Sequence, residues 1–334
     1  MAKALRMTII LKCHPERSEG SHFLCYYLCM SISDLFKNKT DRIASTHLGK
    51  KSEGSNVYDP SLLVAVPRIE NRKQYSIDEN NLPFCGFDVW HAYEFSCMTE
   101  NGVPVTRVLK LKYPCNSMNI VESKSLKLYL NSFNMQNFGS TIQECLEICS
   151  ELIKSDLQKL LREVVEVKFL DNSAEKVQIF DKYVDIMSLV EESTLQVVAY
   201  KEAPEVLQTS LKSEKEQTYL RFDSLRSNCR VTHQPDFGDV FIYYNSEKKI
   251  DEASLVKYLV SFRSEYHFHE ECCEMIYKRL SDILNAGDEL FVCCLYTRRG
   301  GIDICPARWS NGVNVEDVKP LLDLSKLARS GIKQ

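Results

Sequence analysis

The chain of 334 residues contains only 12 glycines, and none of them forms the Gly-x-Gly-x-x-Gly pattern of a dinucleotide-binding βαβ unit. A Rossmann module is therefore not expected, and a dinucleotide would have to be held by side-chain charge. The cysteines never form the Cys-x-x-Cys pairs of a structural zinc site. No apolar run approaches the length of a membrane span. The formal net charge of −4 argues against a nonspecific nucleic-acid binder.

The composition is that of an ordinary globular protein. Hydrophobic residues make up 44% and charged residues 26%, and the length allows one large domain or two of ordinary size. Fourteen cysteines are many, but they are scattered, and a chain of this length does not need a disulfide scaffold. We expect reduced thiols, most of them acting as small buried hydrophobes.

The first 56 residues are polar and aperiodic, and we expect them to be a flexible extension. A short apolar run at residues 23–30 has the look of a signal peptide, but Glu16 and Glu19 interrupt its basic region. We therefore favour a nonessential extension with Met30 as the working initiator over export.

Beyond residue 56 the sequence predicts the same order of elements twice. Alternating residues predict strands at 87–97 and 103–113 around the turn Asn101-Gly102, and helical spacing predicts helices at 123–132 and 141–162 before a strand at 164–170. The second half follows a matching order. It predicts a strand at 240–244, helices at 252–263 and 269–284, and strands at 290–297 and 302–305.

The repetition also appears in the letters. Residues 125–133 and 254–262 are identical at six of nine positions. Two amphipathic helices can agree this well by chance. We favour two copies of a strand–strand–helix–helix–strand–strand unit, at residues 57–205 and 206–334.

Cys229 is the candidate nucleophile, because a thiolate attacks carbon strongly when a neighbouring group manages its proton. Asp236 follows Pro235, whose ring stiffens the chain and could hold the carboxylate near the sulfur. The alternative is a structural cysteine beside an acid in a surface turn, since most cysteines are inert.

Three further segments carry polar groups that suit a site. The segment 267–273 has ligand types for zinc, but no second ligand set accompanies it, and a helix start whose acids complement the dipole is the alternative. Residues 122–129 place an acid before two lysines, which also suits a solvated helix start. Residues 298–301, Arg-Arg-Gly-Gly, could bind phosphate or form a basic surface turn.

The chain resembles the NADPH-dependent 7-cyano-7-deazaguanine reductases in their two-module form, which are the nitrile reductases of queuosine biosynthesis. Four parts of the sequence carry this resemblance: the run 227–236, the segment 122–129 and the pairs at 269–270 and 299–300. The resemblance covers roughly residues 56–310. It weakens at Cys305-Pro306, where the family usually has Asn-Pro, and in the tail from Trp309.

The resemblance implies an α+β fold of two tandem tunnelling-fold (T-fold) modules, each an antiparallel sheet with a helix pair on one face. It implies a covalent thioimide on Cys229 with Asp236 as proton donor. A guanine-like edge presents two adjacent N–H donors, which an acceptor-only carboxylate can take. The implied substrate contacts are Val121, Glu122, Ser123, His269 and Glu270, and the implied cofactor contacts are Ser123, Lys124, Arg299 and Gly300.

The resemblance further implies reduction of 7-cyano-7-deazaguanine to its 7-aminomethyl product by two NADPH, without a metal, in a cytoplasmic homodimer that binds neither nucleic acid nor membrane. The alternatives are a GTP-cyclohydrolase-like zinc enzyme, a cysteine hydrolase acting on a nitrile, and a noncatalytic T-fold module that binds purines or pterins.

Overall fold

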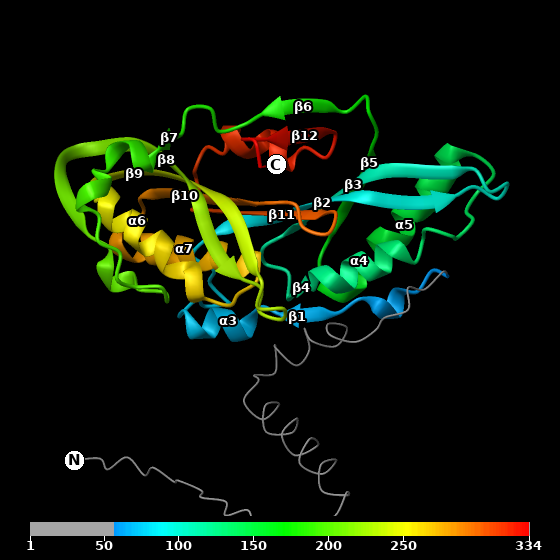
Figure 1. Ribbon diagram of the computed structural model, residues 1–334, viewed down its shortest axis with the longest axis horizontal. Coiled ribbons are helices and arrows are strands. Elements are labelled where there is room, and N and C mark those ends of the chain that lie inside the picture. Colours follow the sequence, from blue (N-terminus) through cyan, green and yellow to red (C-terminus); the bar gives the residue numbers. More distant parts are fainter. Residues whose placement is uncertain (1–56, 334) are drawn as a thin grey trace, which may run out of the picture.

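The computed structural model describes residues 57–333, so the expected extension and Met30 lie outside the described residues. A central sheet of eight strands has the order β5-β3-β2-β11-β10-β9-β8-β7 (Figure 1). Neighbouring strands are antiparallel, except that β7 and β8 are parallel. The strands are β2 (Cys85–Met98), β3 (Pro104–Pro114), β5 (Glu166–Leu170), β7 (Val184–Asp185), β8 (Thr209–Asn228), β9 (Pro235–Ile250), β10 (Glu289–Tyr296) and β11 (Ile302–Trp309).

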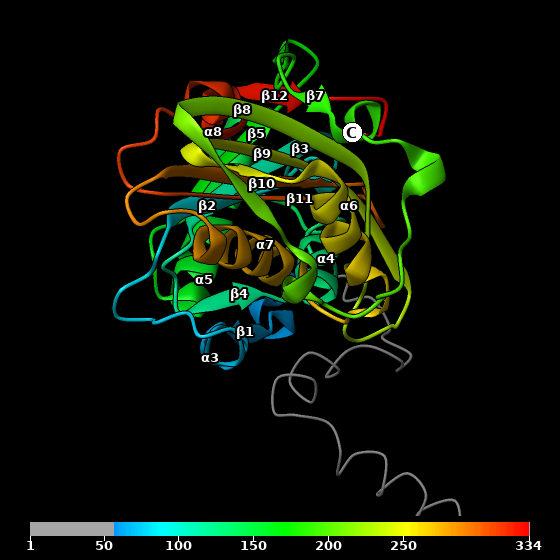
Figure 2. The same ribbon diagram turned by 90° about the vertical axis from the view of Figure 1, so that its left-hand side faces the viewer.

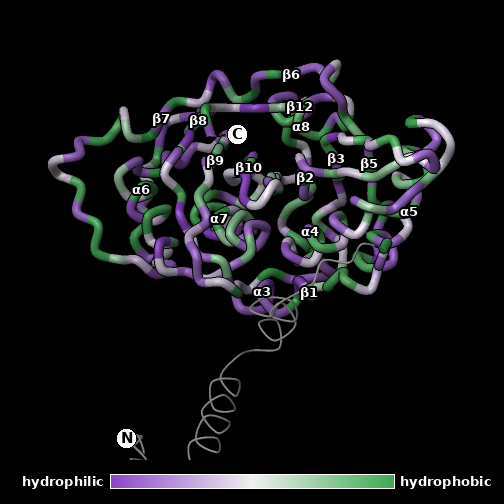
Figure 3. Tube along the Cα trace, turned by 45° about the vertical axis from the view of Figure 1, so that its right-hand side comes forward, coloured by the Kyte–Doolittle hydropathy of each residue, from purple (hydrophilic) through white to green (hydrophobic). Residues whose placement is uncertain are grey.

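Four helices cover one face of this sheet (Figures 1 and 2). They are α4 (Ser123–Asn131), α5 (Ile142–Leu161), α6 (Glu252–Ser261) and α7 (His269–Ile283). In α5 the buried residues recur every fourth position from Cys145 to Leu161, which gives the helix one apolar side. Figure 3 shows the corresponding change between hydrophobic and hydrophilic colours along α5. Two hydrophobic cores result, one under α4 and α5 and one under α6 and α7.

The opposite face of the sheet is covered by shorter segments. Strand β6 (Glu175–Gln178) pairs in parallel with β12 (Lys326–Arg329), and α8 (Lys319–Leu322) lies beside them (Figure 1). A third core fills the space between these segments and the sheet. All eight residues of β11 are buried, because this strand has a packed layer on both sides. Near the start of the described chain, β1 (Ala65–Pro67) pairs with β4 (Asn119–Val121), and α3 (Ile69–Gln74) follows β1.

The two halves of the chain repeat one another in structure. Each contributes a long hairpin and then a helix pair, and the hairpin ends make equivalent parallel bridges, Met98 with Asn137 and Asn228 with Tyr266. The second half then adds β10 and β11 to the sheet, as the repeat predicts. The first half differs: after β5 its chain leaves the central sheet, β6 pairs with β12 instead, and only the short β7 rejoins the sheet, beside β8. The seam between the halves is the pairing of β11 with β2, which runs from Ile302 opposite Ala92 to Trp309 opposite Cys85.

The strands and helices predicted from periodicity are confirmed, with boundaries that differ by a few residues. The sequence did not predict β8, whose first half is exposed and rich in lysine and glutamate, so that no apolar alternation marks it. The eleven described cysteines are all free, and nine of them are buried, which confirms their expected role for this part of the chain. Across residues 57–333, none of the helices combines the length and the apolar character needed to cross a membrane.

Candidate active site

A cavity of about 200 Å³ opens where the two halves meet. Its walls come from the start of α4, the connection between β8 and β9, the start of α7 and the turn between β10 and β11. The lining includes all ten residues that the sequence predicted for a site: Val121, Glu122, Ser123, Lys124, Cys229, Asp236, His269, Glu270, Arg299 and Gly300. The fold therefore brings together segments that are far apart in the sequence, while the role of each residue stays a prediction.

Cys229 lies directly after β8, at the beginning of the connection to β9. Its backbone N–H donates to the carbonyl of Gln234 (2.8 Å), and its carbonyl accepts from His233 (2.9 Å), so the six-residue connection closes on itself. The neighbouring Asn228 is tied to the segment before α7 by hydrogen bonds with the backbone of Glu265 and His267. Cys229 and Cys85 are the two described cysteines that are partly exposed, and Cys229 is the one that lines the cavity.

Asp236 is the second residue of β9 and is buried, so it is not an acid of a surface turn. Its carboxylate forms an ion pair with Arg299 and lies 3.5 Å from Nε2 of His269. Burial alone would raise the pKa of Asp236, but the hydrogen bond and charge of His269 and the charge of Arg299 outweigh it and hold the pKa below the ordinary value. The free site therefore holds Asp236 as a carboxylate at neutral pH.

His269 is the first residue of α7, and its ring is fixed on both sides. It stacks on Tyr296 with 3.8 Å between the ring centres and an angle of 8° between the planes. Its Nε2 faces Asp236, and its buried Nδ1 has no hydrogen-bond partner among the described residues. This arrangement holds an imidazole that can accept or deliver a proton at Asp236.

Glu270 follows in the same helix and is almost completely buried. Its Oε1 has no hydrogen-bond partner within residues 57–333. Burial, and then the charge of Asp88, raise the pKa of Glu270 to about 8, although Arg68 and Arg308 act in the opposite direction. The cavity thus contains an unsatisfied carboxyl group, which is the feature that a ligand with N–H donors would need.

Glu122 has a structural task that the sequence prediction did not assign. As the N-cap of α4, its two carboxylate oxygens accept hydrogen bonds from the backbone N–H groups of Lys124 (3.0 Å) and Ser125 (2.7 Å). Burial raises its pKa, against the effect of these two bonds. A ligand would have to use the remaining lone pairs of a carboxylate that is already held in place.

The cationic residues gather at one side of the cavity. Nζ of Lys127 donates to the carbonyl of Gly300 (2.5 Å), which joins α4 to the turn between β10 and β11. Gly300 has a φ of +59°, and a Cβ at this position would lie 3.2 Å from that Nζ. With Lys124 and Arg299 also in the lining, this side offers the charges that a phosphorylated cofactor requires. Arg298 points elsewhere, since its guanidinium lies over the ring of Tyr93 at 4.6 Å.

The segment 267–273 does not bring metal ligands together. His267 is held by Glu265 (3.1 Å) and Glu271 (3.4 Å), and these bonds raise its pKa against the effect of burial. Cys272 and Cys273 point into the core below α7. Among the described residues, this segment forms no group of three converging ligand atoms.

The sequence reasoning missed the residues that support the site. Arg230, next to Cys229, forms an ion pair with Glu271 (2.9 Å), which is next to Glu270. Apolar walls come from Trp90, Phe268, Ile302 and Ile304. No motif marks these residues, because ordinary core positions look the same in a sequence.

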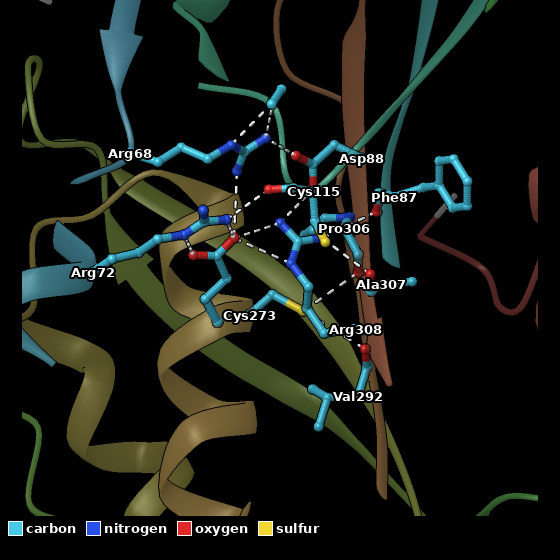
Figure 4. A network of polar contacts seen from close by, with 12 residues as sticks. Arg68, Arg72, Phe87, Asp88, Cys115, Cys273, Val292, Pro306, Ala307 and Arg308 are labelled. Carbon is cyan, nitrogen blue, oxygen red and sulfur yellow. Dashed lines mark hydrogen bonds and ion pairs between the residues drawn. The ribbon is translucent and has the colours of Figure 1, made fainter. Parts of the chain in front are cut away.

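Behind the cavity lies a buried network of charges that was also missed (Figure 4). Arg68 donates to Asp88 (2.5 Å), whose other oxygen lies 2.8 Å from Arg308. Glu274 of α7 contacts three guanidinium groups, at 2.7 Å for Arg72, 2.9 Å for Arg308 and 3.4 Å for Arg68. Charged residues within the otherwise buried strands β2 and β11 were the signal that could have revealed it.

Comparisons with known proteins agree on one family. Residues 55–169 match the family described as nitrile reductase, 7-cyano-7-deazaguanine-reductase N-term, and residues 235–312 match that of QueF-like protein. Three similar proteins carry the name NADPH-dependent 7-cyano-7-deazaguanine reductase. That of Colwellia psychrerythraea is 37% identical over 83% of this chain and 95% of its own length. Those of Rickettsia felis and Desulfotalea psychrophila are 39% and 41% identical, over 80% and 79% of this chain and 94% and 92% of their own lengths.

Proposed function

The chain belongs to the family of NADPH-dependent 7-cyano-7-deazaguanine reductases, and we propose on that basis that its cavity reduces the nitrile of 7-cyano-7-deazaguanine to an aminomethyl group through a covalent adduct with Cys229. The protein is an oxidoreductase that uses NADPH. The observation that carries the proposal is that Cys229, Asp236 and Glu270 line one cavity. Its volume is below the ~300–1,000 Å³ of sites for drug-sized ligands, which suits a single small heterocycle.

The first step adds the thiol of Cys229 across the carbon–nitrogen triple bond. Because Asp236 is ionised in the free site, it can accept the thiol proton and then deliver it to the nitrile nitrogen. The sulfur bonds to carbon, the nitrogen gains the proton, and a thioimide results. The ring of His269 stacks on Tyr296, which keeps its Nε2 beside Asp236. His269 can therefore give Asp236 a new proton after Asp236 has delivered its own to the nitrile nitrogen.

NADPH, when bound, supplies one hydride to the carbon in each of two rounds. After the first, Asp236 protonates the nitrogen and the Cys229 thiolate departs, which leaves a protonated imine. The second hydride converts this imine to the amine. A free imine is lost to water, so the apolar walls Trp90, Phe268 and Ile304 have a chemical task in keeping the cavity dry. Lys124 and Arg299 would hold the phosphate groups at the cationic side, as Gly300 lets the backbone approach.

The substrate would lie with its guanine-like edge on Glu270. That edge offers a ring N–H and an exocyclic amine, and the unpartnered Oε1 of Glu270 supports this orientation. Val121, Ser123 and His269 complete the proposed contacts, with Glu122 as a second acceptor through its free lone pairs.

We also propose the finer points of fold and assembly. The repeated hairpins and helix pairs support two tandem tunnelling-fold modules, at 57–205 and 206–334. A homodimer is supported by β8, in which Leu220, Arg221 and Asn228 are the residues with a strand or bridge partner on the side away from β9 within residues 57–333, so that most of a long edge can accept another chain. The free thiols and the substrate class support a place in the cytoplasm, in queuosine biosynthesis, without direct binding of nucleic acid.

One assay tests the function: oxidation of NADPH by the purified protein in the presence of 7-cyano-7-deazaguanine. We expect two NADPH consumed for each aminomethyl product. Substrate loss without NADPH would instead identify a cysteine hydrolase, and activity that requires stoichiometric zinc would identify a cyclohydrolase-like enzyme. If the protein binds the ligand but shows no turnover under any of these conditions, it is a noncatalytic binding module.

A further inference from the structure

Glu270 lies at the border between the cavity and the buried charge network. It is one helical turn before Glu274 on α7, so the two carboxyl groups lie on the same side of the helix. Glu274 is surrounded by guanidinium groups, and its pKa is lowered to about 2 by Arg72 and Arg308 despite its burial. Glu270, in contrast, has an oxygen without a hydrogen-bond partner in the described part of the chain. The two acids are neighbours in one buried region, yet the pKa of Glu274 is lowered and that of Glu270 is raised.

The network does not balance its charges near Glu270. Its fully buried members are three guanidinium groups and two carboxylates (Figure 4). The third acid, Glu79, contacts Arg72 alone (3.0 Å), and its side chain is 27% exposed. The positive charge in excess therefore lies with Arg68 and Arg308, which share Asp88 and Glu274 between them. A new negative charge beside these two groups would be stabilised.

Charged groups from several surrounding elements act on Glu270. Asp88 of β2 opposes its ionisation, while Arg68 before α3 and Arg308 of β11 favour it. Tyr113 of β3 is also close enough for the charge of Glu270 to affect it. Burial is the largest effect and keeps the carboxyl neutral in the free site, with a pKa of about 8. Its Oε1 lacks a hydrogen-bond donor within residues 57–333, and a ligand can supply one.

We propose that the cavity recognises its ligand by ionising Glu270: a heterocycle edge with two adjacent N–H donors displaces the carboxyl proton to solvent, and Arg68 and Arg308 stabilise the carboxylate left behind. This inference rests on the proposed function and adds the way in which that site selects its substrate class. The ionised carboxylate accepts both N–H groups of a guanine-type edge. A neutral carboxyl, with one donor and one acceptor, instead matches an adenine-type edge, which offers an amine beside a ring nitrogen. Ionisation therefore decides which heterocycle fits.

The test is calorimetry of binding in full-length Cys229→Ala, in which no adduct can form. Titration with 7-cyano-7-deazaguanine at pH 7, in buffers of different ionisation enthalpy, counts the protons released. We expect about one proton, because a group with a pKa of about 8 is mostly protonated at pH 7. Adding Glu270→Gln should abolish the release. The control ligand 7-cyano-7-deazaadenine should release none. Binding without release, or release that survives Glu270→Gln, would overturn the inference.

These outcomes are separate from failure of the proposed function. If the wild-type protein forms an adduct and consumes NADPH but binding releases no proton, the reaction stands and the ionisation of Glu270 does not. If the protein neither binds the nitrile nor forms an adduct, both are wrong.

The role of the network is tested by two substitutions with opposite effects. Below pH 8 the affinity should fall about tenfold for each pH unit, because the proton competes with the ligand. Arg68→Gln should move the start of this fall to higher pH, and Asp88→Asn should move it to lower pH. A purely structural role would weaken binding in both variants without opposite shifts, and that result would overturn the assignment. Arg68→Lys, which keeps the charge, should restore the wild-type profile, and circular dichroism confirms folding of each variant. If Arg68→Gln does not fold, the pH profiles of Arg68→Lys and Asp88→Asn still show whether the charge at Asp88 shifts the fall in affinity in the expected direction.

Discussion

Arg299 forms an ion pair with Asp236. The residue predicted to bind the cofactor therefore contacts the residue predicted to transfer the proton. The same guanidinium also donates to the side chain of Gln234. It thereby connects the turn between β10 and β11 to the connection that carries Cys229. Its charge is one reason why the pKa of Asp236 lies below the ordinary value. If Arg299 binds a cofactor phosphate as proposed, this ion pair would weaken, and cofactor binding would be coupled to the proton affinity of Asp236.

Arg299→Gln should therefore change two properties at once. We expect a higher KM for NADPH, roughly tenfold for loss of a charge-assisted contact. We also expect adduct formation without NADPH to lose rate at a higher pH than in the wild type. The sign follows from Asp236: removing a positive neighbour raises its pKa, so the carboxylate is lost earlier as the pH falls. Stopped-flow or quenched-flow adduct measurements across pH 4–8 check this.

Arg298→Gln is the matched control for Arg299→Gln, because its guanidinium lies over Tyr93 rather than on Asp236. Both properties should stay close to the wild type. An unchanged pH profile in Arg299→Gln would show that the ion pair does not set the state of Asp236.

Cys229→Ala should abolish the covalent adduct completely. Mass spectrometry of the intact protein mixed with 7-cyano-7-deazaguanine, without NADPH, should show a mass increase equal to the substrate in the wild type alone. Cys85→Ala is the control, since Cys85 is the other partly exposed cysteine within residues 57–333. It should form the adduct as the wild type does. An adduct that persists in Cys229→Ala would move the nucleophile to another residue.

Glu274→Gln should destabilise the fold strongly, by about 3–5 kcal/mol, because it leaves three buried guanidinium groups short of a counter-charge. The pKa of Glu274 is lowered to about 2, so its contribution is present above the ordinary value of 4.5 and is lost as the pH falls toward 2. Urea unfolding at pH 7 and pH 3 should show a smaller difference between variant and wild type at the lower pH. Glu79→Gln, at the half-exposed edge of the network, should cost much less.

Glu270→Gln should have the opposite effect on stability. The pKa of Glu270 is raised from 4.5 to about 8, so the folded state binds the proton more tightly than the unfolded chain. The free energy of unfolding therefore falls as the pH rises from about 4.5 to 8, and glutamine removes this loss. We expect the variant to be more stable than the wild type at pH 8.5, on the order of a few kcal/mol at ~1.4 kcal/mol per pKa unit, and similar at pH 4. Equal stability at both pH values would contradict the raised pKa.

The sequence predicted the elements that have a clear period, and it missed those that lack one. Helix α5 follows from its spaced apolar residues, whereas β8 has none to mark its exposed half. For the site, motifs from four separate segments indicated residues that do line one cavity. The sequence could not show the pairing of Arg299 with Asp236, because that pairing depends on the distance between two elements. The capping by Glu122 is local, and the sequence analysis predicted the helix start without assigning the cap. The charged Arg308 within the buried strand β11 indicated a buried ion pair, but the sequence could not show that Arg72 and Arg308 share Glu274, since pairing across layers leaves no local pattern.

The seam between β11 and β2 has a consequence for how the protein behaves in solution. Both walls of the cavity belong to one polypeptide, with Val121 to Lys127 from the first half and Cys229 to Gly300 from the second. Two separate half-chains would assemble such a cavity only by mass action, and dilution would take it apart. A covalent connection makes the meeting of the halves independent of protein concentration, so each chain retains both of these walls however dilute the solution is.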